Sequence, residues 1–290
     1  LHKAIRRQRQ MCIRDSAYVL FRFYEIPQRD RADSISINTN TQSAVKARDL
    51  RSNSKQILKL KKAYEAKYSN GFFATKRGEI IPADKDKQYC IELSYLGKNL
   101  TAWYMQRPNL SYGETKIFDK YFNTLFKNDY LPEDAYALSF WMRKIMDAWT
   151  QENPLGLEEE LLTMKAYAPY HLLFAISMVF AKCNNQTNVP SPSECLKVAS
   201  ENNLVDSIIN IAANCLNSAI SAEKNNCEQN NRSFIPQNWV KNKSCNAGIM
   251  SAIQNYFSFL PTMNKEMDSK LKNGVKIDSK YFSYRVQAED

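Results

Sequence analysis

The densest run of polar side chains in this sequence begins at Asn38 and reads N-T-N-T-Q-S-A-V-K-A-R-D-L-R-S-N. The amides of Asn38, Asn40 and Gln42 each carry donors and acceptors that suit base edges or peptide backbone. Ser43 or Ser54 is placed to cap a helix, and a helix N-terminus offers backbone N–H groups to an anion. The run therefore has the chemistry of a nucleic-acid or nucleotide contact.

The second half of the run adds positive charge. Lys46, Arg48 and Arg51 are spaced so that, on a helical turn, they present charge along one side toward phosphates. Asp49 lies where it can contact or orient one or both arginines. The residues alone favour a structural role, in which the polar groups cap helices and the aspartate closes a local salt bridge. They leave phosphate binding open.

The order of motifs along the chain resembles a known family. After D-L-R-S-N, which ends at Asn53, come Gly71-Phe72-Phe73 and Lys76-Arg77-Gly78-Glu79. This succession is similar to that of the abortive-infection phage resistance (AIPR) family, over roughly residues 18–130. The resemblance implies a bacterial anti-phage role. It also implies a helix across Asp33–Asn38, where the alternation of serine and isoleucine alone would suggest a strand.

The resemblance further implies that this chain is a C-terminal fragment. Many relatives carry an upstream region, in some cases nuclease-like, with clustered acidic and lysine side chains. We therefore expect no catalytic activity in this chain, and a nuclease if there is any. We expect no cofactor, with Mg²⁺ required only if the full-length protein is a nuclease.

Three functional hypotheses follow. The first is a phage-defence module that engages nucleic acid or a nucleotide, with DNA or RNA as partner. The second is part of a nuclease whose catalytic residues lie mainly upstream, and the third is a structural or oligomerisation module that binds another copy or a defence-system partner. The candidate nucleic-acid-binding residues are Asn38, Asn40, Gln42, Lys46, Arg48, Asp49, Arg51, Asn53, Lys76 and Arg77.

The charge distribution supports an anionic partner. The formal net charge is +10, and residues 1–82 hold 18 lysines and arginines against 7 acidic residues. The remainder of the chain is nearly neutral, so the basic excess belongs to the N-terminal part. A basic module beside a neutral one suggests nucleic acid, while a solvated surface is the simpler interpretation.

Cysteine and histidine usage argues against other classes of site. The seven cysteines are scattered without a C-x-x-C pair, which is typical of reduced thiols in a cytoplasmic protein. The two histidines, His2 and His171, do not lie in a cluster with ligand spacing, so no metal site is expected. His171 falls on an apolar helix and is expected to belong to the core. No apolar run reaches the roughly 18 residues of a membrane span, so no membrane partner is expected.

The pattern of apolar residues predicts a mainly α fold, a helical bundle with a small, incomplete N-terminal α/β portion. Few glycines and prolines argue against an all-β fold. The predicted strand is Tyr18–Ile26. The predicted helices begin with one that carries Ile57, Leu60, Tyr64 and Tyr68 and stops at Asn70-Gly71, and continue over Ile91–Met105, Ile117–Phe126, Ala135–Trp149, Leu157–Ala181, Glu194–Glu201, Leu204–Lys224 and Cys245–Phe259.

Four regions are expected along the chain. Residues 1–16 are expected to be non-native, because M-C-I-R-D-S, ending at Ser16, resembles a translated sequencing adapter. Residues 17–82 form the basic part of the family domain, and residues 83–183 its helical continuation. The Asn-rich, Pro-containing stretch 184–193 opens a C-terminal helical region, 184–290.

Overall fold

The computed structural model of the chain describes residues 46–126, 131–150 and 152–287. All of these described residues belong to one compact unit. The predicted strand Tyr18–Ile26 and the helix that the family resemblance implies across Asp33–Asn38 lie outside the described residues.

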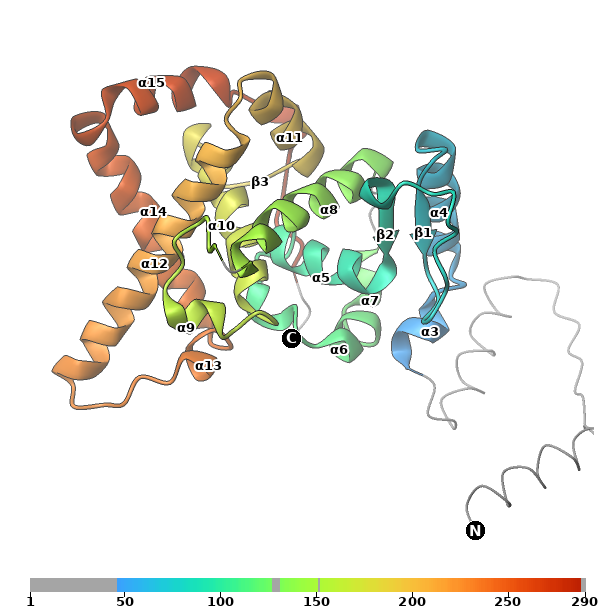
Figure 1. Ribbon diagram of the computed structural model, residues 1–290, viewed down its shortest axis with the longest axis horizontal. Helices are drawn as coiled ribbons and strands as arrows, with labels where there is room; N and C mark the ends of the chain where they lie inside the picture. Colours follow the sequence, from blue (N-terminus) through green and yellow to red (C-terminus); the bar gives the residue numbers. More distant parts are fainter. Residues whose placement is uncertain (1–45, 127–130, 151, 288–290) are drawn as a thin grey trace, which may run out of the picture. The chain divides into compact units, whose positions relative to one another are not determined.

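The described part of the chain is mainly helical, as the sequence predicts (Figure 1). The helices are α3 (Ala47–Arg51), α4 (Lys55–Lys67), α5 (Leu93–Trp103), α6 (Glu114–Phe118), α7 (Phe122–Leu125), α8 (Pro132–Met146), α9 (Glu159–Leu162), α10 (Ala168–Cys183), α11 (Pro192–Glu201), α12 (Val205–Gln229), α13 (Pro236–Trp239), α14 (Lys243–Met263) and α15 (Lys265–Gly274).

Helix α10 forms the centre of the hydrophobic core. Its sequence, A-P-Y-H-L-L-F-A-I-S-M-V-F-A-K-C, is apolar on nearly every face, and such a helix is stable in water only when other elements cover it on all sides. Helices α5, α8, α12 and α14 pack around it (Figure 1). His171 on α10 is fully buried, as expected from its apolar surroundings.

Helix α4 was predicted from the spacing of its apolar residues, and the structure confirms it. Ile57, Leu60 and Tyr64 recur at helical spacing and all three are buried. The helix ends at Lys67, and the chain then turns through Gly71. A Cβ atom at Gly71 would lie 2.7 Å from the backbone oxygen of Tyr89, so only glycine allows this close approach.

Two small sheets accompany the helices. Strands β1 (Phe72–Ala74) and β2 (Cys90–Glu92) are parallel, with Phe73 opposite Ile91. A parallel pair needs a crossover of a dozen or more residues, and residues 75–89 provide it. Strands β3 (Val189–Pro190) and β4 (Phe282–Ser283) are antiparallel.

Three predicted helices differ from the structure. The helix expected from Ile91 begins only at Leu93, because Ile91 pairs in β2. The helix expected over Ile117–Phe126 is two short helices, α6 and α7, which fold back so that the aromatic rings of Phe118 and Phe126 stack. The helix expected over Leu157–Ala181 is divided into α9 and α10, and Pro169 stands in the first turn of α10, a position that proline favours.

The Asn-rich stretch that follows α10 is anchored at several points. The Asn184 side chain donates to the backbone oxygen of Val275 and accepts from the amide of Ile277. Trp103 donates its indole N–H to the oxygen of Pro190, at 2.7 Å. The described residues on both sides of position 184 belong to the same compact unit, and the four-region division stays a prediction.

Candidate functional site

Arg48 is the centre of a buried polar cluster. Its side chain is 10% exposed, and its guanidinium donates to the Ser94 hydroxyl at 2.8 Å and to Asp49 Oδ1 at 2.8 Å. Ser94 in turn donates to Glu114 Oε1, which also lies 3.5 Å from Arg48 Nε. The cluster therefore ties α3 to the first turn of α5 and to the start of α6.

Arg51 makes a second tie between α3 and the elements beneath it. Its Nε donates to the backbone oxygen of Phe118, and its guanidinium lies 4.7 Å from the centre of the Phe122 ring. Ser52 is buried and its hydroxyl donates to the backbone oxygen of Asp49, which closes the end of α3. The side chains of the D-L-R-S segment and the preceding Arg48 thus hold α3 against α5, α6 and α7.

The predicted binding residues therefore separate into groups. Arg48 is buried and Arg51 is half-buried, so these two arginines do not line one open side of a helical turn as the spacing suggested. Lys46 and Asn53 are exposed at the two ends of α3. The amides of the N-terminal half of the run, Asn38, Asn40 and Gln42, lie outside the described residues.

The K-R-G-E motif forms a closed turn after β1. Glu79 folds back so that its carboxylate accepts from the backbone amides of Thr75 and Lys76, at 2.8 and 3.1 Å. Gly78 has a φ of +72°, a conformation that glycine adopts without strain. The side chains of Lys76 and Arg77 are left exposed on the outside of the turn.

Lys61 joins this turn to α4. Its ammonium lies 3.2 Å from Glu79 Oε1 and 3.7 Å from Glu65 Oε1, and it also lies over the Phe72 ring. Although burial opposes ionisation of Glu79, the two backbone amides and Lys61 hold the pKa of its carboxyl below the ordinary value. The turn is therefore fixed to the helix by a carboxylate that stays charged at neutral pH.

A row of lysines runs along the outer face of α4. Lys55, Lys59 and Lys62 follow one another at spacings of four and three residues, which places them on one side of a helix. This side is opposite the buried side of the helix, and all three lysines are exposed. We refer to these three residues as the α4 lysine row. These three lysines are not among the candidate binding residues predicted from the sequence.

The pairing of charges leaves the exposed surface basic. Residues 46–82 contain ten lysines and arginines and three acidic residues, Asp49, Glu65 and Glu79. All three carboxylates contact the less exposed cations, Arg48 and Lys61. In the described part of the chain, no ion pair is found for Lys55 or Lys62, and the exposed cations of this segment carry most of its net charge.

A pocket of about 660 Å³ lies between β2, α5 and α8, and sequence analysis missed it. Its polar residues include Asn99 of α5 and Arg143 of α8. Asn99 is 3% exposed, and its side-chain oxygen has no hydrogen-bond partner among the described residues. Among the described residues, the side-chain oxygens of Asn109 and Asn246 are likewise buried without a hydrogen-bond partner. A lone asparagine within a predicted amphipathic helix was the only sequence signal of this pocket.

The remaining reactive side chains are placed as structural ones. Burial lowers the pKa of His171 to about 4, so its imidazole is neutral at physiological pH. Burial raises the pKa of the Cys183 and Cys215 thiols to about 12, which keeps them protonated and poorly nucleophilic. Among the described residues, histidine, cysteine and carboxylate side chains do not gather into a group that would hold a metal ion.

A family model described as AIPR protein matches residues 1–230 of the chain. The chain therefore belongs to the AIPR family, whose name denotes abortive-infection phage resistance. The match extends beyond the N-terminal motifs through α12, so it includes the central helices as well as the basic segment. Among curated proteins and among solved structures, none matches the chain. Within the described residues, no helix combines the length and apolar character that crossing a membrane requires.

Proposed function

We propose that this chain acts in phage defence by engaging the phosphate backbone of nucleic acid through the exposed cations of residues 46–82. The observation that carries the proposal is that the carboxylates of this segment pair with its less exposed cations and leave its exposed cations on the surface. Its carboxylates contact Arg48 and Lys61, whereas the α4 lysine row points away from the core. A phosphate backbone offers the repeated negative charge that such a surface attracts.

The exposed turn after β1 extends this surface. The hydrogen bonds of Glu79 hold the backbone of this turn in place, and Lys61 connects the turn to α4. The side chains of Lys76 and Arg77 are exposed on its outside, where they can reach a phosphate backbone. We expect this surface to recognise the charge and spacing of the phosphates and not the base sequence, because phosphate contacts carry no sequence information directly.

This proposal assigns different roles to the residues of the polar run. Exposed Lys46 belongs to the proposed phosphate-binding surface with the α4 lysine row. Arg48 and Arg51 support that surface by fixing α3 against its neighbours. The nuclease and oligomerisation alternatives stay predictions that no described residue tests.

Filter binding of the 290-residue chain to duplex DNA and to RNA, over a salt series, tests the proposal. Each neutralised phosphate of B-DNA changes the slope of log K against log salt by about −0.9. The triple variant Lys55→Glu/Lys59→Glu/Lys62→Glu is expected to weaken binding at least tenfold and to flatten that slope by roughly 3. Circular dichroism should show an unchanged helical content.

A matched control separates a specific surface from general charge. Lys165, Lys182 and Lys276 are exposed and lie outside the basic segment. Changing these three to glutamate alters the net charge equally and is expected to leave most of the binding. Undetectable binding by the unmodified chain, or equal loss in both triple variants, would contradict the proposal.

A further inference from the structure

A second pocket lies between the chain that follows α5, the N-terminal half of α14 and the segment after β4. Its volume of about 510 Å³ falls within the range of roughly 300–1,000 Å³ that small-molecule sites occupy. Arg107, Lys243 and Arg285 line it, and the lining residues that the structure describes include no aspartate or glutamate. We call it the α14 pocket. Three cations from three separate parts of the chain therefore meet at one cavity.

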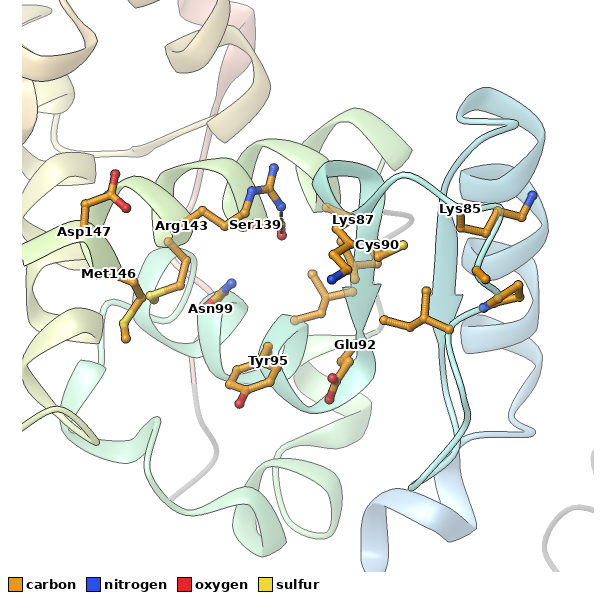
Figure 2. Close-up of a pocket in the computed structure, with 17 residues that line it drawn as sticks. Lys85, Lys87, Cys90, Glu92, Tyr95, Asn99, Ser139, Arg143, Met146 and Asp147 are labelled. Atoms are coloured by element: carbon orange, nitrogen blue, oxygen red, sulfur yellow. Dashed lines mark hydrogen bonds between the residues drawn. The ribbon is translucent and has the colours of Figure 1, made fainter. Parts of the chain in front are cut away.

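The pocket between β2, α5 and α8 has a different balance of charges. Figure 2 shows Lys87 and Arg143 among its lining side chains, but also the carboxylates of Glu92 and Asp147. Charges of both signs weaken the attraction of that pocket for an ion of either sign. The described lining of the α14 pocket carries charge of one sign, and such a cleft raises the local concentration of counter-ions. The α14 pocket is therefore the better place for an anion.

Arg285 is fixed at the α14 pocket by its own side chain and by the backbone beside it. Its Nε donates to the backbone oxygen of Met105 at 2.9 Å, and the amide of Val286 donates to the backbone oxygen of Tyr104 at 3.0 Å. The two terminal nitrogens of the guanidinium donate to no residue that the structure describes. They therefore offer a planar pair of donors that suits two oxygens of one anion.

Arg107 places a second guanidinium charge close to Arg285. Burial and the charge of Arg107 together hold the pKa of the Arg285 guanidinium below its ordinary value. Both arginines nonetheless stay protonated at neutral pH, so their like charges repel each other. An anion beside both guanidinium groups relieves this repulsion.

Lys243 supplies the third cation from the first turn of α14. Its side chain is exposed and makes no ion pair with any described residue. The first turn of α14 contains no acidic residue, although the positive end of a helix dipole favours negative charge there. Lys243 thus stands where a cation is unfavourable for the helix alone. A bound anion would offset both the lysine charge and the helix dipole.

A phosphate group matches these donors better than a carboxylate does. A phosphate ester carries close to two negative charges at neutral pH and three acceptor oxygens, which is enough for cations on several sides. A carboxylate has one charge and two oxygens. The side chains of Gln106 and Gln287 also line the pocket, and amides pair well with hydroxyl groups because they both donate and accept.

We propose that the α14 pocket binds a sugar phosphate, either free or within a nucleotide. Arg107, Lys243 and Arg285 contact the phosphate, and Gln106 and Gln287 contact the sugar hydroxyls. All five residues lie outside residues 46–82. The inference therefore does not rest on the proposed nucleic-acid surface, and either can fail without the other.

Isothermal titration calorimetry of the 290-residue chain with ribose 5-phosphate, ribose, inorganic phosphate and AMP tests this proposal. Ribose 5-phosphate is expected to bind at least about tenfold more tightly than ribose, and more tightly than inorganic phosphate. Tighter binding of AMP than of ribose 5-phosphate would assign the site to nucleotides, and equal or weaker binding to free sugar phosphates. No heat change with millimolar ribose 5-phosphate and AMP, or equal affinity for ribose and its phosphate, would overturn the proposal.

Substitutions of two cations locate the phosphate. Arg285→Gln and Lys243→Gln are each expected to weaken ribose 5-phosphate about tenfold, because each removes a charged donor. Arg285→Lys keeps the charge but not the planar pair of donors, so its affinity should fall between those of the wild type and Arg285→Gln. Arg232 and Lys276 are exposed elsewhere, and Arg232→Gln and Lys276→Gln provide matched controls that should leave the affinity unchanged.

Lys243→Gln keeps the proposal testable if Arg285→Gln disturbs the segment after β4. Arg285→Gln loses the bond to Met105 as well as the charge, whereas the Lys243 side chain makes no hydrogen bond to a described residue. Thermal unfolding of Lys243→Gln should therefore give a midpoint equal to or slightly above that of the wild type. Wild-type affinity for ribose 5-phosphate in folded Lys243→Gln, or an equal loss in the control variants, would overturn the assignment of this pocket.

Discussion

Two polar clusters in this protein show opposite ways of using buried hydrogen-bonding groups. Around Arg48, a guanidinium, a hydroxyl and two carboxylates satisfy one another. In the pocket of α5 and α8, the Asn99 oxygen has no partner among the described residues. The first cluster was prominent in the sequence and holds helices together, whereas the second was inconspicuous and leaves a buried oxygen without a donor.

The difference teaches how to interpret a dense polar motif. Charged groups that complete one another's hydrogen bonds have little capacity left for a ligand, and removing one of them exposes the others to burial without a partner. In this member of the AIPR family, the D-L-R-S segment therefore contains residues placed for folding.

The largest effect expected from this comparison is loss of stability in Arg48→Ala. Removing the guanidinium leaves Asp49, Ser94 and Glu114 without their shared donor. Because the two carboxylates are partly exposed, the expected loss of unfolding free energy is about 3 kcal/mol, at the low end for a broken buried pair. Urea denaturation measures it, with Lys46→Ala as a control that should change stability by less than about 0.5 kcal/mol. A wild-type midpoint for Arg48→Ala would show that the cluster does not support the fold.

His171 extends the comparison to a buried group that titrates. Burial lowers its folded-state pKa to about 4, against 6.5 in the unfolded chain. The unfolded state therefore takes up more protons below pH 6.5, so His171 destabilises the folded protein as the pH falls from 6.5 toward 4. The expected loss is about 2 kcal/mol between pH 7 and pH 5.

The measurement for His171 is the unfolding free energy over this pH range for the wild type and for His171→Leu. The difference between the two proteins isolates the imidazole from the other titrating groups. It is expected to shift by about 2 kcal/mol in favour of the leucine variant on going from pH 7 to pH 5. A difference independent of pH would mean that the imidazole is not buried in its neutral form.

Glu79 is a second polar group whose hydrogen bonds are satisfied, and we expect a smaller effect from changing it. In Glu79→Gln the side chain keeps its length but loses the charge that strengthens its bonds to Thr75, Lys76 and Lys61. Because Glu79 is partly exposed, we expect a loss of about 1 kcal/mol, measured by urea denaturation. The loss should be largest above the ordinary carboxyl pKa and should disappear as the pH falls and Glu79 takes up a proton. An unchanged stability at neutral pH would argue that the turn is held by Gly78 alone.

Asn99→Ala should have the smallest effect on stability. The substitution removes a buried acceptor that has no partner among the described residues, and alanine favours the helix more than asparagine does. We expect a change within about 0.5 kcal/mol, or a slight stabilisation, by thermal unfolding. A loss above about 2 kcal/mol would show that Asn99 makes a structural contact and would weaken the contrast with Arg48.

Much of the fold could be predicted from the sequence because local periodicity matched the tertiary packing. Helix α4 follows from Ile57, Leu60 and Tyr64, and the long helices α12 and α14 follow from similar patterns. Errors arose where tertiary contacts decide the outcome. Ile91 lies in a strand because β1 pairs with it, and a periodic pattern cannot report a partner strand.

The candidate site could be predicted only in part. The basic segment is visible from composition, and the exposed lysines follow from the periodicity of α4. The burial of Arg48 depends on Ser94 and Glu114, which are 46 and 66 positions away in the chain. The pocket likewise combines residues from 81 to 147, and neither Asn99 nor Arg143 carries a recognisable motif.

Urea denaturation of the wild type, Arg48→Ala and Asn99→Ala tests the central contrast most directly. The predicted result is that Arg48→Ala is less stable than the wild type by about 3 kcal/mol, whereas Asn99→Ala is within about 0.5 kcal/mol of it. Equal loss of stability in the two variants, or wild-type stability of Arg48→Ala, would contradict the account.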